Sequence, residues 1–112
     1  MPQYVLGQFI AFLAEALNML LTLYMWIVII GALLSWVSPD PRNPIVRFLY
    51  AVTEPVLWAV RRRLPFVQTG GIDLSPLVVI LGIMLARFVV VRPLYRLAAE
   101  IIATAALVPA LG

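Results

Sequence analysis

The sequence contains no cysteine, no histidine and no lysine. Without cysteine there can be no disulfide and no thiolate chemistry. Without histidine the chain lacks the side chain that most often acts as a general acid or base near neutral pH. The commonest zinc and haem ligands are missing as well. We therefore expect no metal site, no cofactor and no catalytic centre.

Charge is also scarce, since charged residues make up 12% of the 112 residues and hydrophobic residues 64%. The mean hydropathy is +1.07. Soluble domains are only about 45–50% apolar, and a chain of this length has too little interior to bury the excess. The composition predicts an all-α membrane protein with a single membrane domain over residues 1–112.

The first apolar run has no charged residue from Ala16 to Pro39. About 20 apolar residues in a helix cross the hydrocarbon core of a bilayer, so we predict a first transmembrane helix at residues 16–37. Residues 3–15 carry apolar side chains at helical spacing and either extend this helix or lie at the interface. A signal peptide is disfavoured because no basic residue precedes the run and no small-residue cleavage site follows it.

The segment after this run begins with turn-forming residues, Ser38-Pro39-Asp40-Pro41-Arg42. Asn43-Pro44 then has the form of an N-cap followed by a first helical residue, which predicts a loop helix over residues 43–64. Pro55 should kink or divide this helix. Pro65 should end it.

The predicted loop helix carries an apolar stripe at three-to-four spacing and closes on Arg61-Arg62-Arg63. Such a stripe beside arginines is typical of an amphipathic helix lying in the membrane interface. A helix packed only on protein is the alternative. The stripe consists of Ile45, Phe48, Leu49, Val52, Val56 and Val60.

A second transmembrane helix is predicted at residues 74–96. Gln68-Thr69-Gly70-Gly71 forms a flexible return, and Ser75-Pro76 repeats the cap-then-proline start. The apolar span itself runs from about Leu74 to Val91, and Arg87 interrupts it. Residues 97–112 form an apolar tail that is short for a third crossing and either prolongs the second helix or lies at the interface.

Five of the eight arginines lie between the two spans, and none precedes the first. The positive-inside rule therefore predicts a cytoplasmic loop and both termini outside, in an antiparallel hairpin. We expect anionic lipid headgroups to be the partner of these arginines. Nucleic acid is not expected, because no nucleic-acid motif accompanies the basic residues. The five loop arginines are Arg42, Arg47, Arg61, Arg62 and Arg63.

Depth matching gives two further expectations. Gly31 and Gly82 lie equally far from the predicted cytoplasmic boundary on the two spans, and small residues allow close helix packing, so we expect them to mark the helix contact. Arg87 lies near mid-membrane, where an arginine costs about 2.5–3.5 kcal/mol. A cation–π contact with Trp26 at the same depth, or extension of the side chain towards the interface, would offset that cost.

The acidic residues show no hydrolase-like or metal-like arrangement. Glu54, directly before Pro55, and Asp73, directly before the second span, fit helix starts and turn caps better than catalysis. Gly70-Gly71 is not a phosphate loop, because no strand precedes it and no Lys-Ser/Thr follows.

Read in order, these loop motifs resemble the YggT family of small integral membrane proteins. The resemblance covers roughly residues 15–95 and rests on a Trp-Ser end to the first span, Asn-Pro, Thr-acid-Pro, Arg-Arg-x-Leu-Pro and Gly-Gly-Ile-Asp-x-Ser-Pro. Trp58-Ala59-Val60 departs from the Arg-Pro expected there in some members. The matching positions are Asn43, Pro44, Thr53, Glu54, Pro55, Arg61, Arg62, Pro65, Gly70, Gly71, Asp73, Ser75 and Pro76.

The resemblance implies a bacterial plasma-membrane protein, with relatives in chloroplasts. Bacterial relatives are linked to cell division and osmotic tolerance, and chloroplast relatives to nucleoid distribution and haem attachment. We expect a non-enzymatic assembly or scaffold factor that acts through the loop and associates with a membrane protein partner or with itself. A homo-oligomeric channel or osmotic-response pore, with Arg87 facing its lumen, is one alternative, and a small accessory subunit of a larger complex is another.

Overall fold

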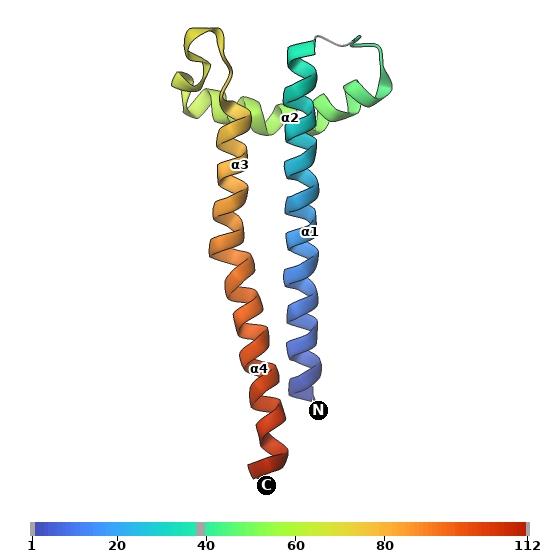
Figure 1. Cartoon of the computed structure of the whole chain (residues 1–112), viewed down its shortest axis with the longest axis vertical. Coiled ribbons are helices and arrows are strands. Elements are labelled where there is room, and N and C mark those ends of the chain that lie inside the picture. Colours follow the sequence, from blue (N-terminus) through green and yellow to red (C-terminus); the bar gives the residue numbers. More distant parts are fainter. Residues whose placement is uncertain (1, 38–39, 112) are drawn as a thin grey trace. The chain divides into compact units, whose positions relative to one another are not determined.

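The computed structural model describes residues 2–37 and 40–111, and these residues form helices without any strand. The predicted turn at Ser38-Pro39 lies outside the described residues. The elements are, in order, α1 (Pro2–Val37), α2 (Pro44–Arg63), the 3₁₀ helix η1 (Pro65–Gly71), α3 (Ser75–Ala86), the π-helical turn η2 (Arg87–Val91) and α4 (Arg92–Leu111) (Figure 1).

Two helices are long and apolar enough to cross a membrane: the 36 residues Pro2–Val37 and the 33 residues Ser75–Leu107. About 20 residues would suffice for one crossing. In their most apolar windows only 11% and 17% of the residues are buried, whereas the core helix of a soluble protein is mostly buried. Residues 3–15 thus extend the first long helix, and the apolar tail continues the second.

The described chain forms two compact units, each made of its own segments. We call Met1–Leu21 with Met84–Gly112 the terminal unit, and Thr22–Ile83 the loop unit.

Small side chains bring two helices together in the terminal unit. A Cβ atom at Gly7 of α1 would lie 2.6 Å from Ile102 Cγ1 and 3.2 Å from the carbonyl oxygen of Ala98, both in α4. Ala14 and Ala98 are fully or almost fully buried, at 0% and 2% exposure. Only a residue without a side chain allows the backbones to approach this closely.

Arg87 opens the π-helical turn η2 and is half-buried. A π turn contains one extra residue, so it changes the face that later side chains present. Val91 at its end is 3% exposed, and the guanidinium of Arg92 lies 4.0 Å from the ring centre of Phe88.

In the loop unit, α2 runs crosswise to α1 (Figure 1). The side chain of Asn43 accepts a hydrogen bond from the backbone N–H of Ile45 at 2.9 Å, and Pro44 follows as the first helical residue. This is the predicted capping. The helix then ends at Arg63, where the Leu64 N–H donates to the Val60 carbonyl at 2.8 Å.

The predicted apolar stripe of α2 includes both exposed and buried residues. Ile45 and Phe48 are 69% and 58% exposed, whereas the buried residues are Val46, Leu49, Thr53 and Leu57. Of the two outcomes predicted for Pro55, a kink or a division, the division does not occur, because α2 continues through this proline.

Gly70 and Gly71 have φ angles of +70° and +77°, which other residues adopt at a cost. They reverse the chain at the end of η1, and the Leu74 N–H then donates to the carbonyl of Val67 at 2.8 Å. Val67 is 1% exposed and anchors the turn. This return brings the segment before α3 back to α2.

The predicted contact between Gly31 and Gly82 was wrong. A Cβ atom at Gly82 would meet nothing within 4 Å, whereas one at Gly31 would lie 3.8 Å from Thr53 Oγ1 of α2. Equal depth in two helices does not determine the direction in which each residue faces. Gly31 therefore packs on the loop helix, and the tight glycine contact lies at Gly7.

Candidate functional site

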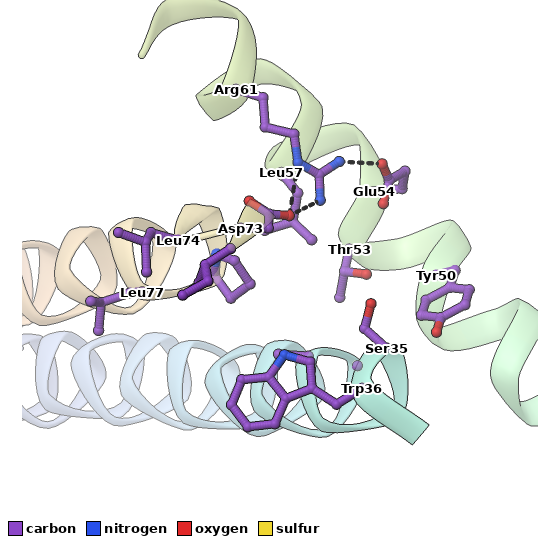
Figure 2. A pocket seen from close by; sticks show the side chains of 14 residues that line it. Ser35, Trp36, Tyr50, Thr53, Glu54, Leu57, Arg61, Asp73, Leu74 and Leu77 are labelled. Carbon is purple, nitrogen blue, oxygen red and sulfur yellow. Dashed lines mark hydrogen bonds and ion pairs between the residues drawn. The ribbon is translucent and has the colours of Figure 1, made fainter. Parts of the chain in front are cut away.

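Arg61 of α2 joins two carboxylates from different parts of the loop unit (Figure 2). Its Nη1 donates to Glu54 Oε1 at 2.6 Å, while Nη2 and Nε donate to Asp73 Oδ2 at 2.5 and 3.0 Å. Glu54 lies two helical turns before Arg61, so both project from the same side of α2. The guanidinium thus ties the middle of α2 to the segment before α3.

Asp73 uses its other oxygen to start α3. Its Oδ1 accepts hydrogen bonds from the backbone N–H of Ser75 at 3.0 Å and from the Ser75 hydroxyl at 2.6 Å. Ser75 is completely buried. The capping role predicted for Asp73 is therefore observed, and the same carboxylate also holds Arg61. We call Glu54, Arg61, Asp73 and Ser75 the Arg61 network.

The electrostatics favour the charged form of each partner. Burial opposes ionisation of Asp73, but hydrogen bonds from Arg61 and Ser75 outweigh it and lower the pKa of this carboxyl below its ordinary 3.8. The hydrogen bond to Asp73, helped by Glu54, raises the pKa of Arg61 above its ordinary value against a smaller effect of burial. Both groups are charged throughout the physiological pH range.

Thr53 supports the network from the buried face of α2. It is 1% exposed, and its hydroxyl donates to the carbonyl of Leu49 at 2.8 Å, one turn earlier in the helix. Its buried hydroxyl is therefore satisfied. Because Thr53 also lies against Gly31, it sets the distance at which α2 crosses α1.

A groove of about 220 Å³ lies beside the Arg61 network within the loop unit. One part of its lining is apolar and the other part is polar, as the side chains in Figure 2 show. Concave sites that combine an apolar lining with a few convergent polar groups are the usual form of ligand sites. Its lining includes Ser35, Trp36, Tyr50, Thr53, Glu54, Leu57, Arg61, Asp73, Leu74 and Leu77.

The five loop arginines have different surroundings. Arg61 is 21% exposed and bound within the chain, whereas Arg42, Arg47, Arg62 and Arg63 are exposed. The guanidinium of Arg62 lies 5.3 Å from the ring centre of Trp58, a cation–π distance. The set predicted to meet lipid or a partner thus separates into one internal arginine and four at the surface.

The motif residues of the loop begin its helices, form its return or line the groove. Asn43 and Pro44 begin α2, Pro65 begins η1, Gly70 and Gly71 make the return, and Ser75 and Pro76 begin α3. Thr53, Glu54, Arg61 and Asp73 line the groove. The motif residues from Thr53 to Pro76 therefore belong to the joint between α2 and α3, whereas Asn43 and Pro44 lie at the opposite end of α2.

Sequence reasoning missed the pairing of Arg61 with Asp73 and the groove beside it. The seven-residue spacing of Glu54 and Arg61 could have indicated that they share a face. Nothing local indicated Asp73, because its approach depends on the left-handed turn at Gly70 and Gly71. Over residues 2–37 and 40–111, His, Cys, Asp and Glu form no group of three that could hold a metal ion.

Over the described residues, these features define a helical protein with two membrane-length helices and an arginine-rich segment between them. The family model described as CCB3/YggT matches residues 10–94. The chain therefore belongs to the CCB3/YggT family, as its motifs predicted.

Relatives from three bacteria are similar to the chain. It is 42% identical over 66 residues to an uncharacterised protein in the proC 3′ region of Vibrio alginolyticus, covering 59% of this chain and 34% of that one. It is 34% identical over 77 residues to an uncharacterised protein of Pseudomonas aeruginosa, covering 69% and 38%. It is 41% identical over 59 residues to uncharacterised protein YggT of Escherichia coli K12, covering 53% and 30%. The matches thus span about a third of each relative's length, and no solved structure matches the chain.

Proposed function

We propose that the protein is a non-enzymatic integral membrane protein of the bacterial plasma membrane that acts as an assembly or scaffold factor. Its two long helices form an antiparallel transmembrane hairpin with a cytoplasmic loop and both termini outside. Three observations support this: the two membrane-length helices, their low burial within the chain, and the concentration of arginines between them.

The single observation that carries the scaffold proposal is the Arg61 network. A connection that only joins two helices needs no internal ion pair and no shared cap. Here an ion-paired arginine, a shared cap and two left-handed glycines hold α2 against the start of α3. Ordering a loop costs conformational entropy, so a loop held this way presents a defined surface, as docking of another protein requires. A process such as cell division or the biogenesis of a membrane complex would use such a surface.

In this proposal α2 lies in the membrane interface. Its exposed apolar side chains, Ile45, Phe48 and Val56, enter the headgroup boundary, and Arg62 and Arg63 meet anionic lipid. These three side chains are 40% to 69% exposed, which supports packing against the apolar part of the membrane rather than against other residues of the chain.

A homo-oligomeric channel is the second candidate. It is favoured by Arg87, which occupies the first position of the π-helical turn η2, a type of turn frequent at functional sites. A small subunit of a larger complex would use the same arginine against another chain.

Photo-crosslinking in native membranes tests the scaffold proposal. A photoreactive residue is placed at Phe48 or Trp58, which are 58% and 55% exposed on α2, and at Phe12, which is 64% exposed on α1, as a matched control. We expect one defined heterologous protein from the α2 positions that is absent from the α1 position. Capture of only this chain, in a ladder of fixed size, would contradict the scaffold and favour the channel.

A further inference from the structure

The groove beside the Arg61 network has a lipid-like lining. Trp36 of α1 is 81% exposed, and Leu74 and Leu77 are 45% and 53% exposed, although all three line the groove. Large apolar side chains left this open at the end of a membrane-length helix offer a surface for a hydrocarbon chain. Leu57 closes the groove from the side of α2 and is 8% exposed.

The polar edge of the groove is acidic. Glu54 and Asp73 carry two negative charges there against the single positive charge of Arg61, which leaves one negative charge in excess. Asp73 already accepts hydrogen bonds on both oxygens. The carboxylate of Glu54, by contrast, is 54% exposed and receives Arg61 on Oε1, so it has capacity for another donor.

We propose that this groove binds the primary-ammonium headgroup of a zwitterionic phospholipid of the phosphatidylethanolamine type. The ammonium donates to Glu54, and the first part of an acyl chain lies on Trp36, Leu74 and Leu77. The hydroxyls of Ser35 and Tyr50 line the same groove and are donors suited to the phosphate oxygens. The inference rests on the membrane assignment in the proposed function but not on the scaffold role.

Charge and size select this ligand over others. An anionic headgroup would meet the excess negative charge. A choline headgroup carries the same positive charge but has no N–H to donate. The volume of about 220 Å³ is below the roughly 300–1,000 Å³ of sites for drug-sized molecules, so it suits a headgroup and one chain segment rather than a partner's helix.

Native mass spectrometry of the purified chain in detergent tests the proposal. The protein is titrated with phosphatidylethanolamine, phosphatidylcholine and phosphatidylglycerol of identical acyl chains. We expect the ethanolamine lipid to bind roughly tenfold more tightly than the choline lipid, as a charge-assisted hydrogen bond predicts. Equal affinity for the ethanolamine and choline lipids would overturn the proposal, whereas binding of the anionic lipid reports on the exposed arginines Arg62 and Arg63.

Variants locate the binding. Glu54→Gln removes the charge but keeps an acceptor for Arg61, and it should abolish the ethanolamine preference. Glu54→Asp keeps the charge and should retain it. The matched control Glu100→Gln, an exposed glutamate of α4 in the terminal unit, should leave the preference unchanged.

The failure of this inference can be separated from that of the scaffold proposal. An ethanolamine preference without any crosslinked partner supports lipid binding alone. If Glu54→Gln instead abolishes capture of a protein partner while lipid affinities stay equal, the proposal is overturned and the groove receives a basic side chain of that partner.

Discussion

The contacts that stabilise the terminal unit internally differ in kind from those that stabilise the loop unit internally. In the terminal unit the close approach is made by Gly7 and Ala98, with no hydrogen-bonding group needed. In the loop unit an arginine, two carboxylates and two buried hydroxyls fix the arrangement. In lipid, small-residue packing is a general means of joining helices. A polar network is specific, because each member has one geometry that satisfies it.

The motif residues by which the sequence resembles the family lie in the loop unit. There a changed Arg61, Asp73 or Ser75 leaves a hydrogen-bonding partner unsatisfied, whereas the contact at Gly7 requires only that the residue has no side chain. The most specific chemistry of the chain thus lies in its connection rather than in its membrane-length helices.

The largest expected effect is in the terminal unit. Gly7→Leu would place a side chain where even a Cβ atom lies 2.6 Å from Ile102. We expect a loss of about 3 kcal/mol in the free energy of unfolding, the upper range for overpacking, measured by unfolding in detergent. The control Gly82→Leu places the same side chain where no atom lies within 4 Å. A similar loss in both variants would show that the close contact at Gly7 does not matter.

Asp73→Ala should have the next largest effect, because it removes the start of α3 and the partner of Arg61 together. We expect a loss of about 2 kcal/mol, reduced by solvent screening because the Asp73 side chain is 34% exposed. Glu100→Ala serves as the control, since this exposed glutamate belongs to the terminal unit. An Asp73 variant as stable as the Glu100 variant would contradict the role of the Arg61 network.

The same carboxylate gives a pH dependence. The pKa of Asp73 is lower in the folded chain than its ordinary 3.8, so its stabilising contribution is complete above that value. It is lost as the pH falls below 3.8 through the folded-state pKa. Unfolding measured from pH 7 to pH 3 should therefore show an acid loss of stability that is smaller in Asp73→Asn. Identical pH profiles would exclude this linkage.

The smallest expected effect is at the return after η1. Gly71→Ala forces a side chain into a left-handed conformation at φ +77°, although no atom lies within 4 Å. We expect a loss of about 1 kcal/mol from backbone strain alone. Gly82→Ala, in a helix with open space around it, should instead gain about 0.5–1 kcal/mol. If both alanine variants changed the free energy of unfolding in the same direction, the result would be inconsistent with backbone strain at Gly71.

The helices could be predicted from the sequence because their signals are local. Asn43-Pro44 marks the start of α2, because the Asn43 side chain accepts a hydrogen bond from the N–H of Ile45, two residues further on. The helix predicted at residues 43–64 is observed at Pro44–Arg63. Asp73 and Ser75 mark the start of α3 in the same way.

Contacts between helices could not be predicted in this way. Equal depth along two helices suggested Gly31 and Gly82 as partners, but depth does not give the side of the helix on which each residue lies. Gly31 faces Thr53, and a Cβ atom at Gly82 would have no atom within 4 Å. The pairing of Arg61 with Asp73 depends on a reversal at two glycines whose direction the sequence does not specify. The groove depends on both the contacts between helices and the chain reversal, so it could not be predicted from the sequence.

A double-mutant cycle between Arg61 and Asp73 tests most directly whether the Arg61 network holds the loop unit together. The free energy of unfolding is measured for the parent chain, Arg61→Ala, Asp73→Ala and the double variant. The account predicts a coupling energy of about 1–2 kcal/mol, because either single change already breaks the interaction. If the losses of the two single variants summed to the loss of the double variant within about 0.3–0.5 kcal/mol, the two residues would act independently and the prediction would be contradicted.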